Sequence, residues 1–143
     1  MTFNKAFSVA PMMNWTDSHC RYFMRLLNPN ILLYTEMITA DALLFGNKRK
    51  YLQYNDEEHP IALQLGGSDP RKMKQAAIIG ADYGYDEINL NIGCPSDRVQ
   101  QGSFGACLMA KPKLVAECTN AIIEAVNIPV TIKTRIGIHD IDK

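Results

Sequence analysis

The stretch IALQLGGSDPRKMKQAAIIGADYGYDEINLNI, residues 61–92, holds two apolar runs separated by one amphipathic segment. The runs 61–65 and 87–92 are short and aliphatic, which indicates buried strands. Between them, Asp69 is a candidate helix cap and Pro70 suits the first helical position. Small and apolar residues then recur at helical spacing, so the predicted inner face of this helix holds Met73, Ala76, Ala77 and Gly80. The stretch is a strand–helix–strand unit, which favours two parallel strands.

The same alternation continues on both sides of this unit. Apolar runs at 7–11, 31–36 and 128–135 predict three more strands, and helical patterns occupy 16–28 and 110–127. Spacing predicts two inner helix faces, made of Cys20, Phe23, Met24 and Leu27 in the first helix and of Val115, Cys118, Ile122 and Ala125 in the last.

The region between the second and third predicted strands is less regular. MITADALLFG, residues 37–46, has a helical pattern, whereas NKRKYLQYNDEEHP, residues 47–60, reads as an irregular polar segment. The basic run NKRK with the nearby Tyr51 and Tyr54 could contact a phosphate backbone, but such a run is more often a solvated surface.

The order of elements predicts an α/β protein with about five parallel strands and intervening helices. No G-x-G-x-x-G follows the first strand and no G-x-x-x-x-G-K-[ST] occurs, so the nucleotide-binding doubly wound folds lack their usual signature. A (β/α)8 TIM barrel fits better, although a whole barrel takes about 250 residues. We therefore expect residues 1–143 to form the N-terminal part of a TIM barrel within a longer protein.

Composition narrows the possible classes of protein. The chain has 15 Lys and Arg against 15 Asp and Glu, so no overall charge favours nucleic acid. No apolar stretch approaches the ~20 residues that cross a bilayer, and the N-terminus lacks the pattern of a signal peptide. The four cysteines form no C-x-x-C pair, which argues against a zinc site or a thioredoxin-like motif. We expect reduced thiols, no metal and a cytoplasmic protein.

Cys94 is the cysteine that packing explains least well. Cys20 and Cys118 fall on predicted helical core faces, and Cys107 reads as a small buried residue. Cys94 instead lies just past a strand, between Gly93 and Pro95, where a core side chain is least expected. The segment 96–109 that follows is a candidate lid, because loops of this length are often functional. These features favour a functional role for Cys94 over packing.

Other polar residues lie near the carboxyl ends of predicted strands, where α/β folds bind ligands. Gln64 could be a hydrogen-bonded core amide or a ligand contact, whereas Lys133 in a strand needs a partner and suits an anionic or electron-rich ligand. Asn89 and Asn91 lie on one such strand, and periodicity does not decide which of them points inward. The sequence PMM, residues 11–13, could contact a flat ring or could serve packing alone.

Four longer motifs together resemble the tRNA-dihydrouridine synthases, and in particular their A-type bacterial branch. The motifs are YTEMITADALL, HPIALQLGGSDP, YDEINLNIGCPSDRVQQGSFGACLM and PVTIKTRIGI, and the resemblance extends along essentially the whole chain. It implies a flavin-binding TIM barrel followed by a helical tRNA-binding domain. It also implies FMN as the cofactor, NADPH as the reductant and uridines in tRNA, near the tip of the D-loop, as the substrate.

The resemblance also assigns roles to single residues. It implies that Cys94 is the general acid that protonates C5 of the uridine while the reduced flavin gives a hydride to C6. Pro11, Met12 and Met13 would line the flavin, and Gln64 and Lys133 would contact its ring. Asn91 and Arg135 would contact the tRNA substrate. A thiol suits the acid role because it is mostly protonated at neutral pH.

One departure from the family's pattern leads to a further expectation. The family's flavin-phosphate site comes from later barrel strands that this chain lacks, so the chain alone is expected to bind FMN weakly or not at all. Self-association through exposed sheet edges is a hypothesis for such a partial barrel. Two alternative functions are another flavin TIM-barrel oxidoreductase and a non-catalytic RNA-binding module.

Overall fold

Five parallel strands lie side by side in the order in which they occur in the sequence. The computed structural model describes residues 7–96, 99 and 102–137. The strands are β1 (Ser8–Val9), β2 (Leu32–Tyr34), β4 (Ile61–Gly66), β5 (Glu87–Asn91) and β6 (Val130–Lys133). Their order in the sheet is β1-β2-β4-β5-β6, and every pairing is parallel. A sheet in strict sequence order is the arrangement of a (β/α)8 barrel, so the expected partial TIM barrel is confirmed.

A sixth strand, β3 (Ile38–Thr39), was not predicted. It pairs with the carboxyl end of β4, whereas β2 pairs with the beginning of β4. Tyr34 is opposite Ala62 and Ile38 is opposite Leu65, so β2 and β3 form one interrupted strand with an extra residue. Two residues are too few to produce a strand pattern, so the sequence indicates only the helical pattern over residues 37–46.

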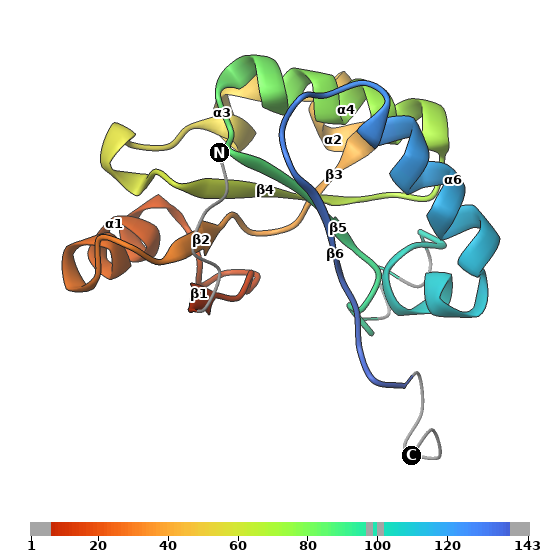
Figure 1. Ribbon diagram of the computed structural model, residues 1–143, viewed down its shortest axis with the longest axis horizontal. Coiled ribbons are helices and arrows are strands. Elements are labelled where there is room, and N and C mark those ends of the chain that lie inside the picture. Colours follow the sequence, from red (N-terminus) through yellow and green to blue (C-terminus); the bar gives the residue numbers. More distant parts are fainter. Residues whose placement is uncertain (1–6, 97–98, 100–101, 138–143) are drawn as a thin grey trace.

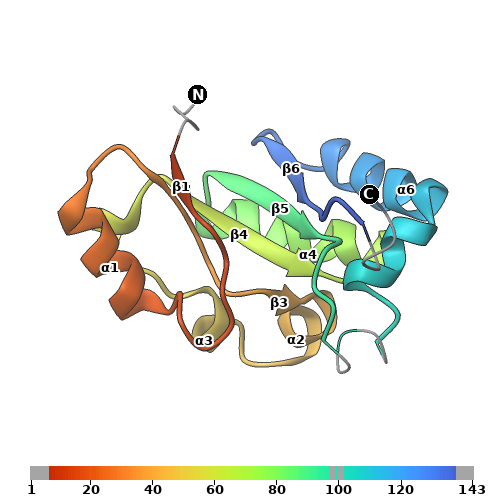
Figure 2. The same cartoon turned by 90° about the horizontal axis from the view of Figure 1, so that it is seen from below.

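Helices cover one face of the sheet, and the other face is open (Figure 1). The helices are α1 (Ser18–Leu27), α2 (Ala40–Phe45), α3 (Lys48–Leu52), α4 (Pro70–Tyr83) and α6 (Pro112–Ile123), with short 3-10 helices at Asp56–Glu58 and Gly105–Ala110. Figure 2 shows α4 and α6 side by side along the outer face of β4 and β5. The segment 47–60, predicted to be irregular, thus contains α3 and a 3-10 helix. No helix in the described part of the chain is long and apolar enough to cross a membrane.

Helix α4 packs as its sequence predicts. Asp69 caps it by accepting from the backbone N–H groups of Arg71 and Lys72. All four residues of the predicted inner face are buried: Met73, Ala76, Ala77 and Gly80. A Cβ at Gly80 would lie 2.4 Å from Cδ2 of Leu63, so glycine lets the helix approach β4 closely.

Helix α1 does not bury its predicted apolar face. Phe23 is 56% exposed, and the buried residues are Arg21 and Arg25. Nε of Arg21 bonds Oε2 of the fully buried Glu58 at 2.5 Å, and Arg25 donates to the carbonyl of Glu58 at 2.9 Å. The prediction was wrong because apolar spacing cannot detect a carboxylate that lies 37 residues away in the sequence.

Side chains alternate between the two faces of the sheet. Outward residues join the core beneath the helices; from β4 and β5 they are Ile61, Leu63, Leu65, Ile88 and Leu90. The inner face carries polar residues instead, among them Gln64 on β4, Asn89 on β5 and Thr131 on β6, which are Cα partners across the three strands. The core of the protein therefore lies between sheet and helices, and the inner face is available for a site.

Candidate active site

Three polar side chains of β5 lie on the same face of the sheet. Glu87, Asn89 and Asn91 alternate with the core residues Ile88 and Leu90. Glu87 is fully buried, and Asn89 is 2% exposed. The question that periodicity left open is thus resolved, because residues two apart on a strand share a face and both asparagines point inward.

Hydrogen bonds join these residues to the neighbouring strands. Nε2 of Gln64 donates to Oδ1 of Asn89 at 2.7 Å, and Nδ2 of Asn91 donates to Oε1 of Gln64 at 3.0 Å. Nδ2 of Asn89 donates to Oγ1 of Thr131 at 2.8 Å, and the Thr131 hydroxyl donates to Glu87. Gln64 is therefore a hydrogen-bonded amide, which is the first of the two interpretations that its sequence position allowed. It also borders a pocket, so a ligand contact remains compatible with its position.

That pocket has a volume of about 400 Å³ and opens at the carboxyl ends of the strands. This volume lies within the range of small-molecule sites. Its lining comes from β4, β5, β6 and the segments after β1, β2, β5 and β6: Pro11, Met13, Met37, Gln64, Asn91, Gly93, Cys94, Pro95, Lys133 and Arg135. Apolar side chains, two amides, a thiol and two cations thus surround one cavity.

Seven of the eight residues predicted for the site line this pocket: Pro11, Met13, Gln64, Asn91, Cys94, Lys133 and Arg135. Met12 is the exception. Met12 does not line the pocket, and its backbone N–H donates to Oγ1 of Thr16 at 3.0 Å. The loop after β1 thus turns Pro11 and Met13, but not Met12, toward the pocket.

The backbone of Cys94 is held on both sides. Its N–H donates to Oδ1 of Asn91 at 2.9 Å, and its carbonyl accepts from the N–H of Ala106 at 2.9 Å. Gly105 has a φ of +69°, and a Cβ there would lie 2.6 Å from the Cys94 carbonyl oxygen. Only glycine fits this close contact without strain. The thiol, 3.6 Å from Oγ of Ser96, is thus presented by a fixed backbone.

Gly93 allows the segments after β5 and β6 to pack closely against each other. A Cβ at Gly93 would lie 3.1 Å from the carbonyl carbon of Thr134, so the segment after β5 packs closely on the segment after β6. This contact brings Cys94 and Arg135 to the same rim of the pocket. The candidate lid, 96–109, includes residues 97, 98, 100 and 101, which lie outside the described residues; its last residues belong to the 3-10 helix Gly105–Ala110.

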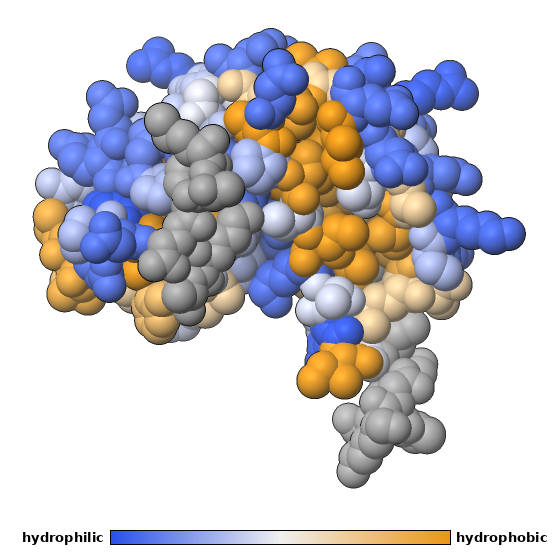
Figure 3. All heavy atoms as spheres, viewed as in Figure 1, coloured by the Kyte–Doolittle hydropathy of each residue, from blue (hydrophilic) through white to orange (hydrophobic). Residues whose placement is uncertain are grey.

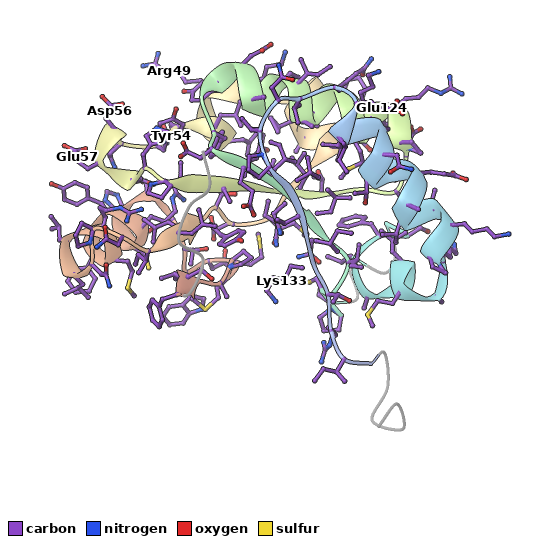
Figure 4. The ribbon with its side chains drawn as sticks, in the orientation of Figure 1. Arg49, Tyr54, Asp56, Glu57, Glu124 and Lys133 are labelled. Carbon is purple, nitrogen blue, oxygen red and sulfur yellow. The ribbon has the colours of Figure 1, made fainter. Side chains whose placement is uncertain are left out.

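Lys133 supplies positive charge to the pocket. It is opposite Asn91 in the pairing of β5 with β6, and Figure 4 shows its side chain pointing away from the helical layer toward the open side of the sheet. Its side chain is exposed, and it forms no ion pair with any residue that the structure describes. Such an ammonium group can stabilise an anionic or electron-rich ligand.

A smaller cavity of about 250 Å³ lies next to Cys94 and is lined mainly by apolar and aromatic side chains. Tyr51, at the end of the basic run, reaches this cavity together with Met37 and Phe104. Arg49 of the same run extends from the opposite side of the sheet, away from Lys133 (Figure 4). The basic run therefore does not line either cavity as a unit.

Burial also changes the chemistry at the base of the site. Burial, reinforced by the nearby Glu87 carboxylate, raises the pKa of Tyr34 to about 12. The Tyr34 hydroxyl donates to Oε1 of Glu87 at 3.1 Å. Tyr34 thus stays a neutral donor at physiological pH.

The other three cysteines lie away from the pocket. Cys118 is buried beneath α6, as predicted, and burial raises the pKa of its thiol to about 11. Cys20 is half-buried on α1 rather than on a core face, and Cys107 is half-buried with its thiol 3.0 Å from the Phe104 carbonyl oxygen. All four cysteines are free thiols, and the described residues contain no cluster that could hold a metal ion.

Sequence reasoning missed several residues of the site. Met37 follows a very short strand, and nothing in its local pattern marks it as a pocket residue. Tyr34, Glu87 and Thr131 belong to otherwise apolar strands. Glu87 is the first residue of its strand, and a charged residue at that position is a signal that could have identified it. These residues meet at the site only because strands that are far apart in sequence pair with each other.

The family model described as "Dihydrouridine synthase (Dus)" matches residues 8–143. The chain is 62% identical over 142 residues to a tRNA-dihydrouridine(20/20a) synthase of Vibrio vulnificus, which covers 99% of the chain and 43% of that relative. It is 64% identical over 136 residues to the protein of the same name from Escherichia coli K12, covering 95% of the chain and 39% of that relative.

A third relative, the tRNA-dihydrouridine(20/20a) synthase of Shewanella oneidensis, is 61% identical over 97% of the chain and 41% of its own length. The chain thus spans about two fifths of the length of the curated relatives it matches. The family match extends over nearly all of the chain and includes every residue that lines the pocket. The chain belongs to the dihydrouridine synthase family.

Proposed function

We propose that this chain is the N-terminal part of the catalytic barrel of a cytoplasmic tRNA-dihydrouridine synthase, which reduces uridines in tRNA to 5,6-dihydrouridine. The proposal includes the later strands and a helical tRNA-binding domain in the full-length protein. The observation that carries it is the meeting of Cys94 with Pro11, Met13, Gln64 and Lys133 around one pocket. The names of the relatives support the substrate and suggest positions 20 and 20a.

The residues of the pocket fit the isoalloxazine ring of FMN. Pro11 and Met13 offer an apolar wall for a flat ring, and the pocket volume of about 400 Å³ suits a ring with a small base beside it. The amide of Gln64 can both donate to and accept from the ring edge. Lys133 would stabilise negative charge on that edge. FMN, once reduced by NADPH, would supply the hydride for C6 of the uracil.

Cys94 would complete the reaction at the other carbon. Hydride addition at C6 leaves an enolate-like anion whose negative charge extends over C4 and C5, and this anion needs a proton at C5. Sγ of Cys94 gives up its proton to C5, so that the thiol becomes a thiolate and the 5,6 double bond becomes a single bond. The fixed backbone of Cys94 suits this step, because proton transfer requires the donor within hydrogen-bond reach.

The remaining polar residues would handle the RNA. A uridine stacked in an RNA cannot lie against a flavin, so the base must leave its stack first. Asn91 and Arg135 lie at the rim of the pocket beside Cys94, where the extruded nucleotide would enter. The Arg135 guanidinium can bind a phosphate or a base edge.

The visible spectrum of purified full-length protein tests this proposal most economically. A tRNA-dihydrouridine synthase should be yellow with bound FMN, and tRNA treated with it and NADPH should gain two mass units per modified uridine because two hydrogens are added. A non-catalytic RNA-binding module would be colourless, and another flavin oxidoreductase would be yellow but leave the tRNA mass unchanged. Either of these outcomes would refute the proposed function.

A further inference from the structure

The hydrogen bonds of the inner face run in one direction. They lead from Asn91 through Gln64 and Asn89 to Thr131 and end on Glu87. At each step an amide N–H or a hydroxyl donates to the next side chain. The chain of bonds crosses β4, β5 and β6 at matched positions, so its members cannot easily exchange partners.

Glu87 determines that direction. A carboxylate only accepts hydrogen bonds, so the Thr131 hydroxyl must donate to Glu87 and can only accept from Asn89. Asn89 must then turn its amide nitrogen toward Thr131 and its oxygen toward Gln64. The same requirement orients Gln64, whose oxygen faces Asn91. The acidic group at one end and the backbone N–H donors of Gly93 and Cys94 at the other end therefore require the same orientation of all three amides.

The amide of Asn91, at the far end of this series of hydrogen bonds from Glu87, holds the backbone of Cys94. Because Nδ2 of Asn91 faces Gln64, Oδ1 faces the other way and accepts from the N–H groups of Gly93 at 3.1 Å and Cys94 at 2.9 Å. With the amide reversed, Nδ2 would point at two N–H donors, and both bonds would be lost. The position of Cys94 therefore depends on the orientation of Asn91.

Burial makes this dependence strong. Glu87 is fully buried, Gln64 is 1% exposed and Asn89 is 2% exposed, so bulk water cannot replace a lost partner at these three residues, whereas Asn91 and Thr131 are half-buried. An unsatisfied polar group in such surroundings is costly, and hydrogen bonds in a low-dielectric chain strengthen one another.

We propose that Glu87 is a positioning residue for Cys94: through Thr131, Asn89, Gln64 and Asn91 it fixes the amide that holds the Gly93–Cys94 backbone. This inference rests on the proposed function only where it treats Cys94 as the proton donor. The geometry of the Gly93–Cys94 segment itself can be measured independently of catalysis.

Thr131→Val in the full-length protein tests this inference, because it removes the hydroxyl that links Asn89 to Glu87 at nearly constant volume. Amide hydrogen exchange of Gly93 and Cys94, measured on flavin-free and flavin-loaded protein, should become about tenfold faster or more when their acceptor is lost. Thr131→Ser keeps the hydroxyl and should restore the slow exchange. The matched control is Thr119→Val, which removes a hydroxyl bonded to the Val115 carbonyl on α6 and should leave both amides unchanged.

Catalysis provides the second measurement. With Thr131→Val, kcat for dihydrouridine formation should fall about tenfold or more, because a misplaced acid is inefficient, while KM for tRNA stays within about twofold. If Thr131→Val does not fold, Glu87→Gln serves instead, since a neutral amide at this position permits both directions of the chain and should also accelerate exchange.

Unchanged exchange at Gly93 and Cys94 in both Thr131→Val and Glu87→Gln would overturn the inference. Faster exchange with unchanged kcat would support the inference that Glu87 positions the Gly93–Cys94 backbone. It would refute the proposed role of Cys94 in catalysis. Absence of any dihydrouridine formation by the unmodified full-length protein would refute the proposed function alone, because the exchange experiment does not depend on it.

Discussion

Oδ1 of Asn91 accepts a hydrogen bond from the backbone N–H of Cys94 at 2.9 Å, so a strand residue fixes the position of the thiol. The segment that carries Cys94 is therefore part of the barrel mouth rather than a free loop. The same pocket holds the amide of Gln64 and the ammonium group of Lys133.

The buried ion pair between Arg21 and Glu58 should be essential to stability. Glu58→Gln removes the charge that compensates a guanidinium only 6% exposed, and breaking a buried pair in this way costs about 3 kcal/mol or more. Urea denaturation of the full-length protein measures the change in the free energy of unfolding. The control is Asp41→Asn, which removes the exposed pair with Lys72 and should cause no measurable change. Equal effects of the two substitutions would contradict the structural role assigned to Arg21.

Gly80→Ala should destabilise the protein even though alanine favours helices. The intrinsic gain is about 1 kcal/mol, but the new Cβ would lie 2.4 Å from Leu63 and 3.1 Å from Ile88, and overpacking costs about 1–3 kcal/mol. The free energy of unfolding should therefore fall. Adding Leu63→Val makes room for the methyl group, so the double variant should lose less stability than the sum of the single ones. A stabilised Gly80→Ala protein would show that α4 and β4 are not in close contact.

Stability should decline between pH 10 and 12, partly because of Tyr34. The unfolded chain loses the phenolic proton near the ordinary pKa of 10.0, whereas folded Tyr34 keeps it to a pKa of about 12. Above pH 10 the unfolded state binds fewer protons, so the contribution of Tyr34 to the free energy of unfolding falls as the pH rises. Tyr34→Phe should make this decline shallower, as measured by urea denaturation at several pH values.

The chain alone should associate through its open edges. Among the described strands, β1 and β6 each pair with only one neighbour, and apolar side chains gather over β6 and the adjoining end of α6 (Figure 3). Exposed strand edges of this kind promote pairing between chains. Light scattering on residues 1–143 should therefore give a mass above 16.0 kDa. Ile132→Lys adds a charge to β6, where Ile132 is 40% exposed, and should shift the chain toward the monomer. A monomeric unmodified chain would contradict this expectation.

Much of the fold could be predicted because its signals are local. Helix α4 carries its cap, its first-turn proline and its inner face within 15 residues, and each agrees with the structure. Helix α1 could not be predicted in the same way, because Arg21 is buried by a carboxylate from a distant segment. Strand β3 is too short to show alternation and forms only because β4 offers it a partner.

The candidate site was predictable to a similar extent. The rule that ligands bind at the carboxyl ends of parallel strands brings Gln64, Asn91, Cys94 and Lys133 together, and the structure places all four around one pocket. The chain of bonds behind them was not predictable, since it depends on the register that sets Asn89 between Gln64 and Thr131. Register is a property of the assembled sheet rather than of any single strand.

The most direct test of the central claim is Cys94→Ala in the full-length protein, with Cys20→Ala on α1 as the matched control. Visible absorbance measures bound FMN, and mass spectrometry of tRNA incubated with NADPH measures dihydrouridine. We predict that Cys94→Ala keeps its flavin but forms dihydrouridine at least about a hundredfold more slowly, because general acid catalysis contributes about 10²–10⁴-fold. Cys20→Ala should match the unmodified protein in both measurements. Dihydrouridine formation by Cys94→Ala at the unmodified rate would contradict the assignment of Cys94 as the proton donor.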